Sequence, residues 1–476
     1  MEVEMTDWKE IREEDAPISP ELKLPEVSEL LELIDGKRIS EFRLAALDIM
    51  APDMAAIIEE APEERRVLLY RLLPKGKAAE VFIEMSVETQ QQLISSFTDR
   101  ELSETLGELY MDDTVDIIEE MPALVVKRII KNSSPENRST INKLLRYPGD
   151  SAGSIMTTEY VRLSPDMTVE EALRVIKRVA IDKETIYTCY VTDRERRLLG
   201  LVTARALMLS DRETLLSDIM QDSVIFATTT EHREDVANKF NKYGFIALPV
   251  VDNELRLVGI VTVDDAMDVM REETEEDFQK MAAMIPTETE YLRTPSYKLF
   301  LSRIPWLLLL MISATFSSAI LSFFEASLIP ALVLFVPMLM DTGGNSGSQA
   351  SVTAIRGLST GEIALKDVFK VLKKEIIVGV LCGLSLGAVA FGKVLLVDRL
   401  IMNNPAVTLT VAAAVSVSLA FTIITAKIIG STLPLLAKRL GLDPAVMASP
   451  FITTIVDAIG LILYFVISAN VFGLVI

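Results

Sequence analysis

The stretch DPAVMASPFITTIVDAIG, residues 443–460, begins the last apolar segment of the chain and carries an acid, Asp457, well inside it. An ionised side chain in the hydrocarbon core of a bilayer is costly, so an acid at such a position indicates an ion path. Ser449, Thr453 and Asp457 are spaced four residues apart, which on a helix places their oxygens along one stripe. Because Pro450 has no backbone N–H, we expect a carbonyl near this stripe to lack its helical partner.

A second polar segment, PMLMDTGGNSGSQASVT at residues 337–353, interrupts an earlier apolar run and contains three glycines. The residues that share one helical face there are Asp341, Asn345, Ser348, Gln349 and Val352. The glycines let another helix or its carbonyls approach closely. Oxygen ligands suit a hard divalent cation, and neither segment offers a thiol or imidazole for zinc or copper. The two segments together predict a cation path.

Charge and hydropathy divide the chain into an acidic half and an apolar half. Lys+Arg number 47 against 68 Asp+Glu among 476 residues, a formal net charge of -21, and the excess acid precedes Ile304. The mean hydropathy is +0.33. These values fit a soluble domain joined to a membrane domain. Nucleic acid is not expected as a partner, because phosphate binding needs clustered Lys and Arg.

Five apolar stretches are long enough to cross a bilayer core, which requires roughly 20 residues. We place them at 304–325, 328–357, 370–397, 406–435 and 445–475. Lys and Arg gather before the first stretch, between the second and third, and between the fourth and fifth. The positive-inside rule therefore predicts a cell-membrane protein with a cytoplasmic N-terminal half and a C-terminus outside. The acidic N-terminal decapeptide MEVEMTDWKE does not read as a cleaved signal peptide.

The soluble half contains two kinds of unit. Residues 24–146 have helical periodicity in repeated phrases, which predicts short helices stacked in a superhelix, and residues 1–23 read as a disordered tail. Residues 147–268 contain two similar segments, at 153–214 and 218–268. Each has a Met-led start, a helix with an acidic first turn and a β-hairpin ending in Gly-hydrophobic-Val-Thr. This order resembles a tandem pair of CBS domains, an α/β fold.

The resemblance to CBS domains also implies ATP binding, although the residues support it in only one of the two copies. Such pairs use a Thr and an acid three residues beyond it. The second copy has both, Thr262 and Asp265, whereas the first has Thr203 but Ala206.

An acidic helix is expected directly after the second copy, over VDDAMDVMREETEEDFQKMAAM. Its acids that share or adjoin one face are Asp265, Asp268, Glu272, Glu273, Glu276 and Asp277. One interpretation is a solvated charged helix. The other is a Mg²⁺ site, because a divalent cation relieves the repulsion between crowded carboxylates.

The CBS pair, the acidic helix, the five spans, the words PGDSAGSIMT and GGNSGSQ, and the stretch quoted first together resemble the MgtE-type magnesium channels. The resemblance runs from Leu24 to the C-terminus. It implies a homodimer with a pore between the second and fifth spans, a connecting or plug helix at 269–303 and a transmembrane domain at 304–476. The implied pore ligands for hydrated Mg²⁺ are Asp457, Asn345, Ser449 and Thr453. The implied regulatory acids are Asp265, Asp268, Glu273, Glu276, Asp277, Asp112 and Asp116.

Two residues depart from the family pattern, Asp341 in the second span and Lys427 in the fourth. A buried lysine without a partner would be costly, so we hypothesise that Lys427 pairs with Asp341. If Lys427 pairs with Asp457 instead, the affinity of the pore for Mg²⁺ would fall.

The sequence therefore predicts a Mg²⁺ channel that imports Mg²⁺ passively and is closed by cytoplasmic Mg²⁺. One alternative is a divalent-cation exchanger or a less selective cation channel. The other is a membrane-tethered sensor of Mg²⁺ or nucleotide. No GxxxxGK[ST] word and no nucleophile-base pair occurs, so an enzyme is not expected.

Overall fold

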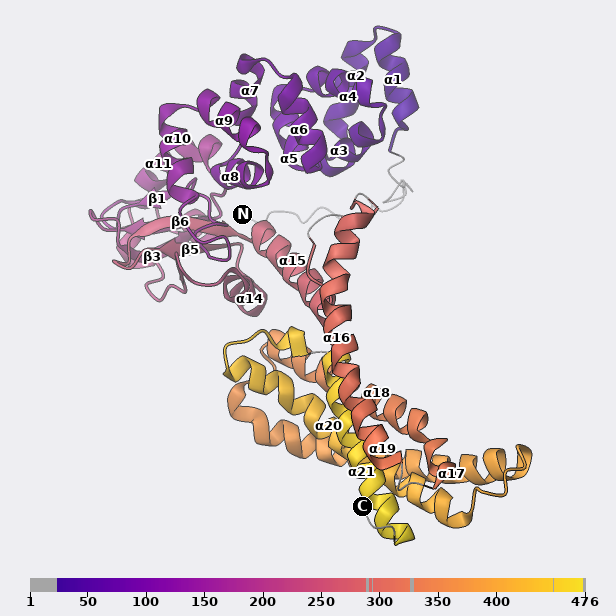
Figure 1. The fold of residues 1–476 in the computed structure, drawn as a ribbon. Helices are drawn as coiled ribbons and strands as arrows, with labels where there is room; N and C mark the ends of the chain where they lie inside the picture. The colour runs from indigo at the N-terminus through magenta and orange to yellow at the C-terminus, as the bar shows by residue number, and fades with distance from the viewer. Residues whose placement is uncertain (1–23, 288–290, 293, 326–328, 448, 474–476) are drawn as a thin grey trace, which may run out of the picture. The chain divides into compact units, whose positions relative to one another are not determined.

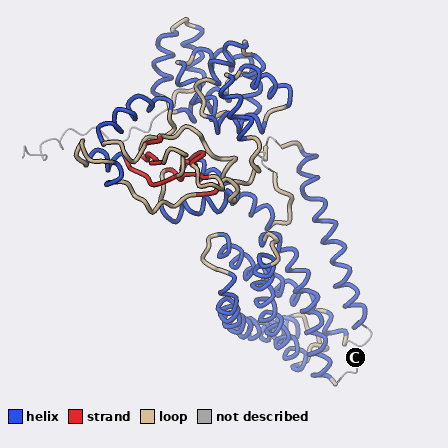
Figure 2. The backbone as a smooth tube through the Cα atoms, turned by 90° about the vertical axis from the view of Figure 1, so that its left-hand side faces the viewer, coloured by secondary structure: helices blue, strands red, loops and turns tan. Residues whose placement is uncertain are grey.

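The computed structural model describes residues 24–287, 291–292, 294–325, 329–447 and 449–473, without the side chains of Asp182, Glu325 and Ser449. The tail predicted at residues 1–23 lies outside the described residues. The chain divides into two compact units, residues 1–267 and residues 268–476. Strands occur only in the first unit among the described residues, and helices make up most of the rest (Figure 2).

Ten short helices form the first part of unit 1. They are α1 (Val27–Asp35), α2 (Ile39–Asp48), α3 (Ala51–Glu60), α4 (Glu63–Leu72), α5 (Lys75–Ile83), α6 (Val87–Ser96), α7 (Asp99–Leu106), α8 (Met111–Glu120), α9 (Ala123–Asn132) and α10 (Pro135–Leu144). The odd-numbered helices α1 to α9 contact one another in succession, as in a superhelical stack. The guanidinium of Arg128 on α9 donates to the carbonyls of Ile94 and Phe97, which caps the C-terminus of α6. The predicted helical domain is confirmed.

Two similar α/β copies follow. The first contains β1 (Arg162–Leu163), α11 (Val169–Val179), β2 (Thr188–Thr192), β3 (Leu198–Thr203) and α12 (Ala204–Leu209); the second contains α13 (Leu216–Ile219), β4 (Ala227–Thr228), α14 (Arg233–Tyr243), β5 (Ala247–Val251) and β6 (Leu257–Thr262). In each copy a short parallel pairing precedes an antiparallel hairpin, in the orders β1-β2-β3 and β4-β5-β6. The predicted tandem α/β repeat is confirmed.

The leading segment of each copy pairs with the sheet of the other copy. Thr157 forms a bridge with Ile260 on β6, and Gln221 forms one with Leu201 on β3. The glycine of each Gly-hydrophobic-Val-Thr word permits this approach: a Cβ on Gly200 or Gly259 would lie 2.7 Å from the carbonyl oxygen of Gln221 or Thr157, respectively. The repeated glycine is therefore explained by close backbone contact.

The helix predicted over 269–303 has different bounds in the structure. It is α15 (Val263–Met281), which follows β6 directly, and the next helix begins at Ser296. Ala283 has a positive φ of 53°, and Pro286 lies shortly beyond it, so the chain leaves the helical path here.

The C-terminal unit consists of helices. They are α16 (Ser296–Glu325), α17 (Pro330–Val333), α18 (Val336–Ser359), α19 (Val368–Lys393) with a π-helical continuation (Val394–Ile401), α20 (Leu409–Arg439) and α21 (Ser449–Phe472). Within the described part of the chain, four segments are long and apolar enough to cross a membrane: Ser296–Phe324, Leu365–Ile401, Leu409–Arg439 and Pro444–Phe472. α18 is more polar and packs against α20 and α21 (Figure 1). That α18 also crosses the membrane remains a prediction.

Candidate metal sites

Three glycines of α18 bring its backbone onto α20 and α21. A Cβ on Gly344 would lie 2.9 Å from Cγ2 of Thr453 and 3.7 Å from Oδ1 of Asp457. A Cβ on Gly343 would lie 2.8 Å from Cγ2 of Thr422, and one on Gly347 would lie 2.9 Å from a methyl of Ile452. Larger residues at these positions would separate the helices, so the glycines place α18 beside the acid of α21.

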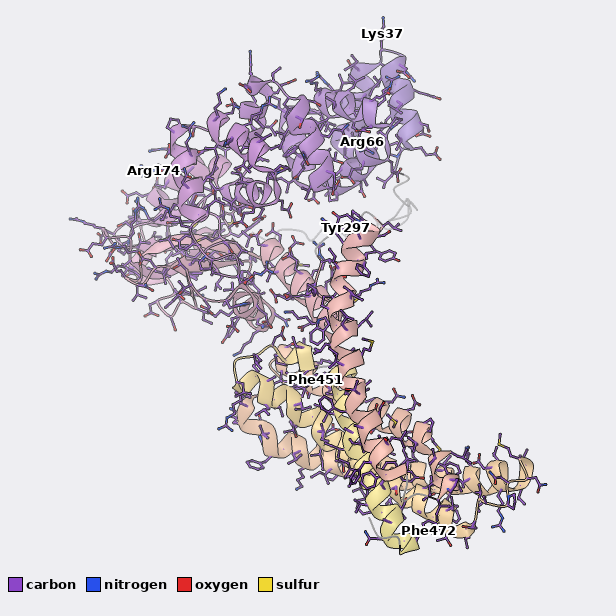
Figure 3. The ribbon with its side chains drawn as sticks, viewed as in Figure 1. Lys37, Arg66, Arg174, Tyr297, Phe451 and Phe472 are labelled. Carbon is purple, nitrogen blue, oxygen red and sulfur yellow. The ribbon has the colours of Figure 1, made fainter. Side chains whose placement is uncertain are left out.

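The carboxylate of Asp457 lies at this contact, close to Gly344. Phe451 and Phe472 mark the two ends of α21 in Figure 3, and Asp457 lies between them in sequence. Its Oδ1 is buried and has no hydrogen-bond partner among the described residues. The charged group that acts on it is another carboxylate, that of Asp341. A buried acceptor beside a like charge is unfavourable unless a cation joins it, so this is where a metal ion would bind.

The predicted pore residues come from α18 and α21. Asn345 directly follows Gly344, and Thr453 faces that glycine from α21. Asp341, Asn345 and Gln349 are all exposed within the unit. They follow one another at intervals of four residues, so they share one face of α18. Polar side chains are disfavoured against lipid, so this face suits a water-filled path. The side chain of Ser449 lies outside the described residues.

The expectation for Pro450 stays a prediction. Pro450 is in the first turn of α21, where a missing N–H removes no helical hydrogen bond. Its own carbonyl accepts from the hydroxyls of Thr453 and Thr454, at 2.8 and 3.1 Å. The carbonyl that the missing N–H would leave without a helical partner is four residues earlier, at Val446, before the start of α21.

The hypothesised pair of Lys427 and Asp341 is wrong. The ammonium of Lys427 donates to Oε1 of Gln349 over 3.2 Å. Gln349 lies eight residues beyond Asp341 on α18, which is about 12 Å along a helix, too far for one lysine to serve both. Asp457 is likewise not the group that Lys427 reaches.

A second group of acids lies in unit 1. They come from α8, from the loop before β2 and from the start of α15, and their charges repel one another. They are Asp112, Asp113, Asp116, Glu184, Asp264 and Asp265. We call them the unit 1 acidic cluster. Asp112 is 6% exposed, and its Oδ1 has no hydrogen-bond partner within the described chain. Burial, and then repulsion by Asp265 and other carboxylates, raises the pKa of Asp112.

Three further members of the unit 1 acidic cluster, Asp113, Asp116 and Glu184, also have raised pKa values. Burial, and then the charge of Asp265, raises the pKa of Asp113 to about 7 and that of Asp116 to about 7. Burial, and then the charge of Asp113, raises the pKa of Glu184 to about 8. No three of these or other acids, His or Cys in the described residues converge tightly enough to hold a bare ion. The arrangement suits Mg²⁺ that keeps several waters.

The predicted regulatory acids thus separate into groups. Asp112, Asp116 and Asp265 belong to the unit 1 acidic cluster, which also contains three acids that were not expected from the sequence. Asp113 and Asp264 each stand next to a predicted acid, and these Asp-Asp doublets could have indicated them. Glu184 lies in a loop whose sequence has no pattern that would have indicated it.

The remaining predicted acids lie farther along α15, which also carries Glu273. Asp268 pairs with Arg271 over 3.0 Å at the surface. Asp277 accepts from the hydroxyl of Ser359 at 3.1 Å, at the end of α18. Glu276 contacts Lys280 at 2.5 Å, and Lys280 also contacts Asp443 at 2.6 Å, before α21. The last turn of α15 is therefore held against the membrane helices by ion pairs.

The Thr and acid expected for a nucleotide contact each other. The hydroxyl of Thr262 donates to Oδ2 of Asp265 over 2.5 Å, and Asp265 also acts on the unit 1 acidic cluster. ATP binding at this position stays a prediction.

The raised pKa values give a pH dependence. Since the folded protein holds protons on Asp113, Asp116 and Glu184 that the unfolded chain loses near pH 4, its free energy of unfolding falls as pH rises through this interval, up to about 8. We expect the melting temperature of the full-length protein without Mg²⁺ to be lower at pH 8 than at pH 6 by about 5 °C, and Mg²⁺ to reverse the loss. Melting curves in detergent across this range measure it. The double variant Asp113→Asn with Glu184→Gln should show a smaller change of melting temperature between pH 6 and pH 8. A melting temperature that rises toward pH 8 without Mg²⁺ would contradict the raised pKa values.

Family models match most of the chain. A model for MgtE, described as a divalent cation transporter, matches residues 336–467. A model for the MgtE intracellular N domain matches residues 49–150, and the CBS domain model matches residues 152–212 and 216–272.

Whole relatives are also similar. The magnesium transporter MgtE of Thermus thermophilus is 38% identical over 423 residues, covering 88% of this chain and 92% of the relative. The magnesium transporter MgtE of Bacillus subtilis is 32% identical over 435 residues, covering 91% of this chain and 94% of the relative. A crystal structure of the soluble part of a magnesium transporter is 32% identical, with a TM-score of 0.50, and covers 52% of this chain and 97% of that chain.

Proposed function

Since this chain belongs to the MgtE family of magnesium transporters, we propose that it is a Mg²⁺-selective channel through which Mg²⁺ enters the cell passively. The single observation that carries the proposal is the buried carboxylate oxygen Oδ1 of Asp457 beside Gly344, which no donor in the described part of the chain contacts. The family consists of transporters, not enzymes, so the carboxylate is assigned to an ion. Asn345, Thr453 and Ser449 would contact the waters of that ion.

The path is proposed to lie between two subunits. The polar face of α18 that carries Asp341, Asn345 and Gln349 is exposed when the described residues of one chain are taken alone. Packing against a second copy around a water-filled axis would remove these side chains from lipid. A homodimer supplies two copies of Asp457 to one path, which suits the double charge of Mg²⁺.

The driving force is proposed to be the electrochemical gradient alone. The distribution of Lys and Arg favours cytoplasmic N-terminal domains and a C-terminus outside. An inside-negative potential of 100 mV then favours the entry of two charges by about 4.6 kcal/mol. No coupled ion or ATP hydrolysis is required.

Cytoplasmic Mg²⁺ is proposed to close the channel through residues 24–146, the CBS pair at 147–268 and the connecting helix. α15 carries Asp264 and Asp265 in its first turn and Asp277 and Lys280 in its last, where they contact the ends of the membrane helices. An ion bound by the unit 1 acidic cluster would therefore act on a helix that reaches the membrane domain. The further acids proposed to respond to Mg²⁺ are Asp268, Glu273, Glu276 and Asp277.

Removing charge from the unit 1 acidic cluster should impair this closure. We expect Asp112→Asn combined with Asp265→Asn to raise the internal Mg²⁺ concentration that halves uptake by about tenfold, because two carboxylates no longer attract the ion. Uptake into vesicles loaded with graded Mg²⁺ measures it. Glu195→Gln, an exposed acid paired with Arg197 elsewhere in the same unit, is the matched control and should leave inhibition unchanged. Equal inhibition in the double variant would contradict a role for the cluster.

Proteoliposomes that contain the full-length protein and an internal Mg²⁺ indicator test the proposed function. A potassium diffusion potential, negative inside, should drive Mg²⁺ entry without a sodium or proton gradient. Entry that requires either gradient would favour an exchanger, and equal entry of other divalent cations would favour a less selective channel. No entry under any condition would favour a tethered sensor.

A further inference from the structure

Lys427 is a basic side chain inside the helical bundle of the membrane domain. It lies within α20 and is 5% exposed. α19 covers its aliphatic stem, since a Cβ on Gly379 would lie 3.5 Å from Cβ of Lys427. Its ammonium donates to the neutral amide oxygen of Gln349, and no carboxylate among the described residues forms an ion pair with it. A buried ammonium without a counter-charge is costly, so a functional reason for it is to be sought.

The partner of Lys427 belongs to the proposed ion path. Gln349 is on the polar face of α18, four residues beyond Asn345, which is about 6 Å along the helix. Asp341 lies four residues before Asn345, and the carboxylate of Asp457 lies level with Gly344. The path therefore has two carboxylates on one side of Asn345 and one ammonium on the other. Because the loop that follows α18 contains the basic residues of the cytoplasmic side, the ammonium is on the cytoplasmic side of the ion site.

We propose that Lys427 is a positioning and specificity-determining residue of ion conduction, whose charge weakens the ion site at Asp457 and favours release of the ion toward the cytoplasm. The inference rests on the proposed function. Rapid conduction requires a site that binds strongly enough to admit an ion and weakly enough to release it. Two carboxylates in each subunit make the site strongly attractive, and a fixed positive charge about one and a half helical turns from Gly344 offsets part of that attraction.

The physical argument also gives the direction of the effect on selectivity. The repulsion between the ammonium and an ion scales with the charge of the ion, so a divalent ion is affected twice as strongly as a monovalent one. Removing the ammonium should therefore tighten Mg²⁺ binding more than Na⁺ binding. The hydrogen bond to Gln349 keeps the ammonium directed toward the path, which makes Gln349 part of the same arrangement.

Two variants change the charge by different routes. Lys427→Met removes the ammonium and keeps a side chain of similar length. Gln349→Glu places a carboxylate against the ammonium and neutralises it in place, where Oε1 of Gln349 now accepts at 3.2 Å. Ser418→Ala, which removes a buried hydroxyl from the same helix, serves as the matched control.

Mg²⁺ uptake into proteoliposomes over a range of external concentrations tests the inference, with melting temperatures recorded for each full-length variant. We expect Lys427→Met and Gln349→Glu each to lower the half-saturating Mg²⁺ concentration by about three- to tenfold and to reduce the maximal rate. Ser418→Ala should change neither quantity. A lower half-saturating concentration together with a lower maximal rate indicates that Mg²⁺ is released more slowly from the site.

A structural role for Lys427 would give a different pattern. If the maximal rate falls in proportion to the amount of folded protein while half-saturation stays constant in both variants, the inference is overturned. A higher half-saturating concentration in Gln349→Glu would also overturn it, because a neutralised charge cannot weaken attraction for a cation. If the unaltered protein takes up no Mg²⁺, the proposed function itself fails, which is a separate result.

Discussion

Replacing Asp457 with asparagine is expected to reduce Mg²⁺ uptake by about a hundredfold. A carboxylate that acts on a divalent ion through one water contributes on the order of 3 kcal/mol, and asparagine is nearly the same size but uncharged. Oδ1 of Asp457 has no hydrogen-bond partner among the described residues, so the substitution breaks no internal bond of that oxygen. We therefore expect the melting temperature to stay constant or rise while uptake is lost. Proteoliposome uptake and thermal unfolding of the same preparation measure the two quantities.

The neighbouring acid provides the control for this experiment. Asp341→Asn removes the same charge from the exposed face of α18, one turn before Asn345, and should reduce uptake less than about tenfold. If Asp457→Asn transports Mg²⁺ as well as the unaltered protein, the ion path must lie elsewhere. If it fails to fold, Asp457 has a structural role that its unpartnered oxygen does not suggest.

Replacing Gly430 with valine is expected to prevent assembly of the membrane domain. A Cβ on Gly430 would lie 2.9 Å from the carbonyl carbon and 3.1 Å from Cα of Gly347, where α20 crosses α18. These contacts are with backbone atoms, so no rotamer change relieves them and the two helices must separate. We expect a loss of stability of about 3 kcal/mol or more, seen as aggregation during size-exclusion chromatography and a lowered melting temperature.

A second glycine in the same domain isolates the steric effect. Gly392 is near the end of α19, and a Cβ there would meet no atom within 4 Å. Gly392→Val should leave elution and melting unchanged, because valine is not less favourable than glycine in a helix. Normal melting and transport by Gly430→Val would show that the helices do not cross as closely as described.

The order of domains could be predicted from the sequence because it depends on local patterns. Helical periodicity over 24–146, the repeated Gly-hydrophobic-Val-Thr words and the long apolar stretches each extend over many residues, and the corresponding elements are present. Asp457 could be singled out because an acid contrasts with an apolar surrounding. α18 could be singled out because glycines and amides interrupt an apolar run.

The partners of individual side chains could not be predicted in the same way. Lys427 binds Gln349 because α18 and α20 cross near Gly347 and Gly430, and spacing along one chain does not fix where two helices cross. Pro450 lies in the first turn of α21, which begins at Ser449, and helix ends are poorly defined by sequence. Glu184 approaches the acids of α8 from a loop that has no periodicity.

The leading segments of the CBS copies make the two copies depend on each other for backbone pairing. Thr157 completes the sheet of β6, and Gln221 completes that of β3, so a fragment with one copy would expose an unpaired strand edge. Deleting either copy would remove a backbone pairing partner from the sheet of the copy that remains. The CBS pair is therefore one unit of stability.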